Sequence, residues 1–207
     1  MIALVDYELG NLGSVDKALR RVGCDAQMTQ DPAVIESAEA IVVPGVGAFG
    51  DCMSNIDRLG LREPLVNAVE SGKPYLGICL GLQLLFETSE EAPGVKGLGV
   101  LKGSVRLFTH DLKIPQIGWN EISINDPRPP HLEGVEQGSH VYFVHSYHVV
   151  PDDESIIATT TDYGYEFCSA VSSGALFASQ FHPEKSQHIG LHVLDNFRRM
   201  VEAGAGS

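Results

Sequence analysis

A glycine-flanked cysteine segment in the first half of the chain most strongly limits how the chain can fold. Residues 75–78 form an apolar run that is typical of a short buried strand. Residues 80–86 are mostly helix formers, and their apolar side chains have helical spacing. Cys79 lies at the junction, with Gly77 and Gly81 two residues away on either side. This pattern predicts a sharp strand-to-helix turn, because only glycine leaves room where strand and helix approach closely.

The predicted turn makes Cys79 a candidate nucleophile. A thiol at a helix N-terminus lies near the positive end of the helix dipole, which favours its thiolate form. The backbone N–H of Leu80 has no partner within such a helix, so it can donate to an oxyanion on a carbonyl that Cys79 attacks. A buried cysteine that only ends a strand is the alternative, because free cysteines are often buried. The segment alone leaves both interpretations open.

Buried strands and amphipathic helices alternate through the first half of the chain. Apolar runs at residues 2–5 and 40–43 resemble the run before Cys79, and such strands are usually parallel and buried on both faces. Helical patterns over residues 51–59 and 61–70 lie before the cysteine segment. We therefore expect an α/β fold with a mixed, mostly parallel central sheet that helices flank.

The second half of the chain is richer in short strands. Turn signals there separate β-prone segments, which predict strands at residues 104–108, 120–124, 141–150, 156–161, 167–172 and 176–179. No linker separates the two halves, and a chain of 207 residues suits one α/β domain with a large core. We therefore expect residues 1–207 to form a single domain with a smaller β-rich part in its second half.

Composition and charge exclude several classes of partner. The net charge of −13 at pH 7 argues against nucleic acid, because phosphate binding needs clustered Lys and Arg. No apolar stretch approaches the roughly 18 residues of a membrane helix, and the segment after Met1 lacks the basic start of a signal peptide. Four scattered cysteines are typical of reduced thiols in a cytosol. These features predict a cytoplasmic protein that binds neither nucleic acid nor membrane.

Two further segments carry chemical signals. The glycine-rich residues 44–50 do not have the spacing of a phosphate-binding loop, so an ordinary turn or a second oxyanion donor is expected there. In the segment Phe-His-Pro-Glu at 181–184, Pro183 favours an extended conformation at His182. Residues i and i+2 of an extended segment point to the same side. Glu184 can therefore bind one imidazole nitrogen and leave the other free as a base, if Cys79 lies nearby.

The remaining histidines and an acidic loop carry weaker signals. His145 with His148, and His188 with His192, have spacings found among metal ligands, but their neighbours provide no third ligand. We therefore expect no metal and no cofactor. The acidic loop at residues 87–94 is either a solvated surface or the source of a carboxylate for a substrate ammonium group.

Three motifs occur in order along the chain: Pro-Gly-Val-Gly-Ala-Phe at 44–49, Gly-Ile-Cys-Leu-Gly-Leu-Gln at 77–83 and Phe-His-Pro-Glu at 181–184. With these motifs the chain resembles the class I (triad) glutamine amidotransferases. Further segments make it most similar to the glutaminase subunits of imidazole glycerol phosphate synthases within that family. These are Asp-Tyr-x-x-Gly-Asn-Leu, Ile-Gly-Trp-Asn, Tyr-Phe-Val-His-Ser-Tyr and Phe-His-Pro-Glu-Lys-Ser, which begin at residues 6, 117, 142 and 181.

The resemblance implies hydrolysis of L-glutamine to glutamate and ammonia through a thioester. Cys79 would be the nucleophile, His182 the acid and base, and Glu184 the group that orients His182. The N–H of Leu80 and one from Val46 or Gly47 would hold the oxyanion. For the substrate, the resemblance implies four further contacts, made by Gln83, Glu91, Ser146 and Tyr147. The choice between Glu90 and Glu91 stays open.

The resemblance also implies a partner. A (β/α)8-barrel cyclase subunit would form a heterodimer with this chain and use the ammonia to make imidazole glycerol phosphate and AICAR in histidine biosynthesis. Asn11, Trp119, Tyr142 and Lys185 would belong to the surface that faces the cyclase. Three alternatives stay open, namely a subunit of a purine, pyridoxal phosphate or anthranilate synthase, a non-catalytic regulatory module and a cysteine peptidase.

Overall fold

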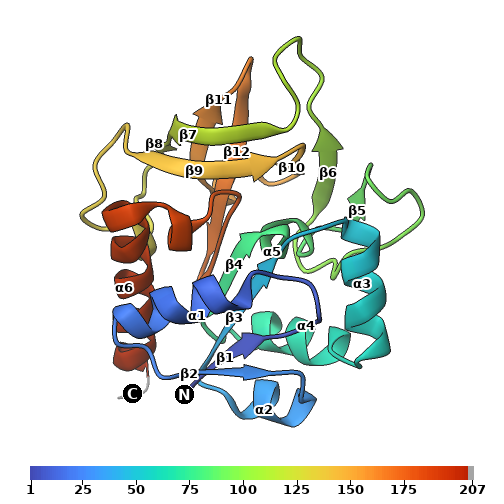
Figure 1. Ribbon diagram of the computed structural model, residues 1–207, viewed down its shortest axis with the longest axis vertical. Coiled ribbons are helices and arrows are strands. Elements are labelled where there is room, and N and C mark those ends of the chain that lie inside the picture. The colour runs from blue at the N-terminus through green and yellow to red at the C-terminus, as the bar shows by residue number, and fades with distance from the viewer. Residues whose placement is uncertain (205–207) are drawn as a thin grey trace.

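Five parallel strands form the centre of the fold in the computed structural model, which describes residues 1–204 (Figure 1). They lie in the order β2 (Ala26–Thr29), β1 (Ile2–Val5), β3 (Ala40–Gly45), β4 (Tyr75–Cys79) and β13 (Leu176–Ser179). All residues of β1, β3, β4 and β13 are buried. Their apolar runs are continuous because helices cover both faces of the sheet.

The alternation of side chains along β1 shows how the two faces are covered. Ile2 and Leu4 belong to a core with α1 (Leu12–Arg21) and α6 (Gln187–Gly204), whereas Ala3 and Val5 belong to a second core on the opposite face. The second core includes residues of α2 (Pro32–Ser37), α3 (Phe49–Arg58) and α4 (Arg62–Glu70). None of the helices within residues 1–204 is both long and apolar enough to cross a membrane.

The β-rich half extends the same sheet, mostly with antiparallel pairs, in the upper part of Figure 1. Next to β13 lie β12 (Glu166–Ser173), β10 (Tyr147–Pro151), β6 (Gly103–Leu107) and β5 (Thr88–Ser89), and a branch adds β11 (Ile157–Asp162) and β8 (Ser123–Ile124). A separate two-stranded sheet contains β7 (Gln116–Glu121) and β9 (His140–His145). Within residues 1–204 there are also three short 3-10 helices: η1 (Pro130–Leu132), η2 (Glu154–Ile156) and η3 (Pro183–Lys185). The predicted fold class, a mixed sheet with parallel centre and β-rich second part, is confirmed.

Several predicted boundaries differ from the structure. The helix after Cys79 is α5 (Leu80–Gln83), which is shorter than the predicted 80–86. It ends early because the carbonyl of Leu84 accepts a hydrogen bond from Leu98 N and that of Leu85 accepts one from Leu101 N. The predicted strand 141–150 is two strands, which belong to different sheets and are separated at Ser146.

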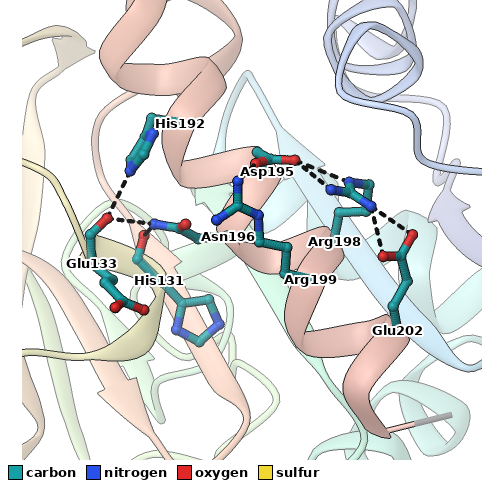
Figure 2. Close-up of polar contacts among 8 residues, drawn as sticks. All are labelled: His131, Glu133, His192, Asp195, Asn196, Arg198, Arg199 and Glu202. Atoms are coloured by element: carbon teal, nitrogen blue, oxygen red, sulfur yellow. Dashed lines mark hydrogen bonds and ion pairs between the residues drawn. The ribbon is translucent and has the colours of Figure 1, made fainter. Parts of the chain in front are cut away.

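Helix α6 also fastens the loop that contains η1 to the body of the protein (Figure 2). The amide nitrogen of Asn196 donates to the carbonyls of His131 and Glu133, and the His192 ring bonds the same Glu133 carbonyl. Along the same helix, the guanidinium of Arg198 bridges the carboxylates of Asp195 and Glu202. The loop carbonyls, which have no partner in a strand, are thus satisfied by one helix face.

Candidate active site

Cys79 lies at the carboxyl end of β4 in a strained backbone conformation. Its φ is 55° and its ψ is −108°, a region that residues with a side chain rarely occupy. The flanking glycines are required by packing. A Cβ on Gly81 would overlap the carbonyl oxygen of Val43, and one on Gly77 would lie 2.8 Å from the Cβ of Ala178. The chain therefore turns here only because residues 77 and 81 are glycines.

Two later residues meet the same strand end. His182 follows β13, which pairs with β4, and its Nδ1 lies 2.8 Å from Oε1 of Glu184 in η3. Both side chains are 2% exposed. The other imidazole nitrogen, Nε2, is buried and has no aligned hydrogen-bond partner within residues 1–204. Burial alone would lower the pKa of His182, but interactions with Cys79 and Glu184 raise it. The raised pKa favours a protonated imidazolium beside the sulfur, the form that pairs with a thiolate.

One cavity of about 290 Å³ contains nearly all of the predicted pocket residues. Its lining includes Cys79 and His182 together with Val46, Gly47, Leu80, Gln83, Glu91, Ser146 and Tyr147. Glu90 is not among the lining residues, and its carboxylate instead accepts a hydrogen bond from the N–H of Leu107. The structure therefore places Glu91, rather than Glu90, where it can contact a ligand in the cavity.

The glycine-rich loop after β3 is held over this cavity by contacts from three directions. The Tyr7 hydroxyl donates to the carbonyl of Pro44 at 2.6 Å, and the Cys52 thiol lies 3.9 Å from the carbonyl of Val46. The N–H of Phe49 donates to Glu91 at 2.8 Å. Val46 and Gly47 line the cavity, as does Leu80 at the start of α5.

Hydrogen bonds that the motifs did not predict organise the opposite wall. The Gln83 side-chain nitrogen donates to the Tyr147 carbonyl at 3.1 Å and to Oε1 of Gln180 at 3.0 Å. Gln180 in turn donates to the Cys79 sulfur at 3.5 Å. Sequence reasoning missed Gln180. The sequence did contain a signal for it. Residues i and i+2 of an extended segment point to the same side, and Gln180 precedes His182 by two residues, as His182 precedes Glu184.

Three of the four predicted partner-facing residues contact one another through their side chains. The Trp119 and Tyr142 rings are 6.1 Å apart in an edge-on arrangement, and Lys185 Nζ lies 5.6 Å from the Tyr142 ring centre. Trp119 is 46% exposed, and its neighbour Ile117 on β7 is 59% exposed. Asn11 lies at the start of α1, a helix that packs against η3, and its carbonyl accepts the first helical hydrogen bond. Trp119, Tyr142 and Lys185 therefore form one cluster, in which Trp119 and Lys185 are exposed and Tyr142 is half-buried.

The histidine pairs with metal-like spacing have other partners. His148 bonds the Tyr165 hydroxyl at 3.0 Å, and His192 bonds the carbonyl of Glu133 at 2.8 Å. His145 bonds the Tyr147 carbonyl and the Gln116 amide, both at 2.8 Å. In the part of the chain that the structure describes, no three His, Cys, Asp or Glu side chains are grouped as metal ligands would be.

Comparisons with known proteins agree with this geometry. The family model for class-I glutamine amidotransferases matches residues 3–200. The imidazole glycerol phosphate synthase subunit HisH of Syntrophotalea carbinolica is 51% identical over 207 residues, which cover 97% of this chain and 100% of the relative. The subunit HisH of Aquifex aeolicus is 50% identical and the match covers 96% of each chain.

Solved structures with lower sequence identity share the fold. A crystal structure of a glutamine amidotransferase has a TM-score of 0.75 and 22% identity over 100% of both chains. The structure of PurLQS from Thermotoga maritima has a TM-score of 0.73 and 21% identity, over 98% of this chain and 97% of that chain.

Proposed function

Because the chain belongs to the class-I glutamine amidotransferase family, we propose that it is the glutaminase subunit of an imidazole glycerol phosphate synthase in histidine biosynthesis. The observation that carries this proposal is that Cys79 and His182 line one cavity at the ends of β4 and β13, with Glu184 bonded to the His182 ring. The names of relatives that are about half identical over the full chain support the choice of synthase.

The reaction follows from the groups around the cavity. The sulfur of Cys79 attacks the side-chain amide carbon of L-glutamine, and a carbon–sulfur bond forms while the amide oxygen becomes an oxyanion. The N–H of Leu80 and one from Val46 or Gly47 stabilise this oxyanion, each by about 3 kcal/mol of barrier on the precedent of other oxyanion holes. The carbon–nitrogen bond then breaks and leaves a thioester.

His182 moves the proton in both halves of the reaction. It takes the thiol proton, gives it to the leaving nitrogen as ammonia departs, and then takes a proton from the water that hydrolyses the thioester. The carbon–sulfur bond breaks in this second step, so that glutamate leaves and Cys79 regains its proton. Glu184 stays hydrogen-bonded to Nδ1 of the ring throughout, so Nε2 is the nitrogen that transfers the proton.

A carboxylate and two backbone groups suit the remainder of the substrate. Glu91 lines the cavity and can bind the α-ammonium group of glutamine by charge. The Ser146–Tyr147 backbone forms the edge of the same cavity. The α-amino acid end of the substrate also contacts Gln83, whose two amide hydrogens are already used by the protein and whose oxygen is left as an acceptor.

A closed path for ammonia requires a partner. Ammonia released into water near neutral pH becomes ammonium, which is not a nucleophile. The proposed partner is a (β/α)8-barrel cyclase subunit that docks near the cavity and forms a heterodimer. The exposed Trp119 and Ile117 on β7, with Tyr142 and Lys185 beside them, support this face as the docking surface, since exposed aromatic and apolar residues mark interfaces.

The decisive experiment measures glutamine hydrolysis with and without the cyclase. Wild-type protein should hydrolyse glutamine slowly alone and faster when the cyclase and its ribonucleotide substrate are present, and Cys79→Ala should be inactive in both cases. A glutamine-analogue electrophile should label Cys79. Equal rates for the isolated protein and the liganded complex would contradict coupling to this cyclase, whereas an active Cys79→Ala variant would contradict the mechanism itself.

A further inference from the structure

Two buried glutamine side chains connect the wall of the cavity to the sulfur of Cys79. Gln180 directly follows β13 and is 0% exposed, and Gln83 in α5 is 4% exposed. The side-chain nitrogen of Gln180 lies 3.5 Å from the Cys79 sulfur. Gln180 Oε1 accepts from Gln83 at 3.0 Å. Both amides lie outside the triad, yet one of them touches the nucleophile directly.

The Tyr147 carbonyl fixes the direction of these hydrogen bonds. A carbonyl oxygen can only accept, so Gln83 presents its NH2 group to Tyr147 at 3.1 Å. The second hydrogen of that NH2 group donates to Gln180 Oε1, and this contact turns the NH2 group of Gln180 toward Cys79. His145 Nδ1 lies 2.8 Å from the same carbonyl, which can only accept, so a hydrogen bond there requires Nδ1 to donate.

The resulting donor favours one protonation state of the sulfur. Hydrogen bonds to an ionised acceptor are about twice as strong as those between neutral groups, so an N–H beside the sulfur stabilises a thiolate more than a thiol. The Val144 carbonyl, 3.9 Å from the sulfur, accepts only from the thiol and acts in the opposite direction at a longer distance. Because Gln180 is fully buried, water cannot replace its donor.

We propose that Gln180 is a positioning residue for the nucleophile Cys79. Its side-chain NH2 group holds the Cys79 sulfur in place as a thiolate. Gln83 sets the orientation of that NH2 group. The inference rests on the proposed role of Cys79 as the nucleophile. It adds Gln180, which is not a member of the triad. Because Gln83 also lines the cavity, the substrate pocket and the sulfur share one chain of amide hydrogen bonds.

The test is the rate at which iodoacetamide alkylates Cys79 as a function of pH, measured by mass spectrometry of the Cys79 peptide in the full-length protein. Gln180→Met preserves side-chain length and removes the donor. We expect the midpoint of its profile to rise by about one pH unit, which makes alkylation at pH values below both midpoints about tenfold slower. The other titratable groups that line the cavity, His182, Glu91, His145 and Tyr147, are unchanged in this variant.

A double-mutant cycle separates this role from a general loss of structure. Gln83→Met does not touch the sulfur but frees the Gln180 amide, so it should shift the profile by a smaller amount. In the Gln83→Met/Gln180→Met protein the shift should equal that of Gln180→Met alone. Independent, additive shifts would overturn the chain of hydrogen bonds.

Gln180→Glu provides a second variant if Gln180→Met folds poorly. It keeps the side-chain shape and replaces the donor by an acceptor, so its profile should also move to higher pH. Steady-state assays should show kcat lowered with KM for glutamine nearly unchanged in both Gln180 variants. Identical profiles for wild type and both variants would overturn the proposal. Labelling of wild-type Cys79 by a glutamine analogue is measured separately. Absence of that labelling would contradict the proposed function, whereas unchanged alkylation profiles would contradict only the role of Gln180.

Discussion

The Nδ1 atom of His182 lies 2.8 Å from Oε1 of Glu184 in a setting where both side chains are almost completely buried. A carboxylate in this position fixes the ring orientation and directs Nε2 away from itself, toward the Cys79 side of the cavity. Burial opposes a charged imidazole, but interactions with Cys79 and Glu184 outweigh it and raise the pKa of His182. The protonated ring is therefore stabilised next to the sulfur at neutral pH.

Removal of the carboxylate charge should have two measurable effects. We expect Glu184→Gln to lower kcat for glutamine hydrolysis by about 10²–10⁴, the range seen when an orienting group is lost. Since Glu184 raises the pKa of His182, the variant should have a lower His182 pKa, and the alkaline limb of its pH–rate profile should move to lower pH. Glu63→Gln, which changes an exposed charge on α4, is the control. An alkaline limb at the wild-type pH would contradict the orienting role.

The elbow glycines provide a test of the fold around the nucleophile. Gly81→Ala would place a Cβ on the Val43 carbonyl oxygen, so the packing of β3 against α5 has to open. We expect a loss of at least about 3 kcal/mol in the free energy of unfolding, as for other overpacked or strained core sites. Gly13→Ala is the matched control, because Gly13 lies in α1 with no atom within 4 Å of the added Cβ. Denaturant titration should show no loss for the control, and equal losses for both would contradict the packing argument.

Local sequence patterns were sufficient for most of the central strands and for the contact between His182 and Glu184. Continuous apolar runs predicted β1, β3 and β4 because strands buried on both faces tolerate few polar residues. The i, i+2 geometry around Pro183 predicted the contact between His182 and Glu184. These features are local, so a short segment contains the information that determines them.

Features that depend on distant contacts were not predictable from local patterns. The end of α5 is set by backbone hydrogen bonds from Leu98 and Leu101, which lie well beyond α5 in the sequence. The break at Ser146 arises because β9 pairs with β7 while β10 pairs with β6. Gln180 looks like an ordinary polar residue just after an apolar strand until the structure places Gln83 beside it. In each case a tertiary partner decides the outcome.

His131 should make the protein sensitive to acid. Its ring stacks on Phe177 at 4.8 Å, and neither ring nitrogen has a hydrogen-bond partner within residues 1–204. Burial lowers its pKa to about 4, below the roughly 6.5 of an unfolded histidine. Between these two values the unfolded chain binds the proton more strongly. Stability should therefore fall as the pH drops from about 6.5 to 4, by up to about 3 kcal/mol.

The phenylalanine variant removes this proton-binding group. His131→Phe keeps an aromatic ring between α6 and β13, so its free energy of unfolding should not decline through that window on account of this site (Figure 2 shows His131 beside α6). His188→Phe, at an exposed position, should keep the wild-type pH dependence. Urea titrations at several pH values compare the three proteins. Parallel pH dependence for wild type and His131→Phe would show that another group causes the acid sensitivity.

The exposed cluster on β7 should contribute directly to binding of the proposed cyclase. Trp119 is 46% exposed and contacts Tyr142 edge-on, so Trp119→Ala should not impair folding of the free subunit. If the cyclase covers this ring, its loss should weaken binding by about 2 kcal/mol, or roughly 30-fold in Kd. Met28→Ala is the control, since Met28 is 51% exposed but lies on the edge strand β2, at the opposite end of the molecule in Figure 1. Calorimetric titration with the cyclase should separate the two variants, and an equal Kd for both would place the docking surface elsewhere.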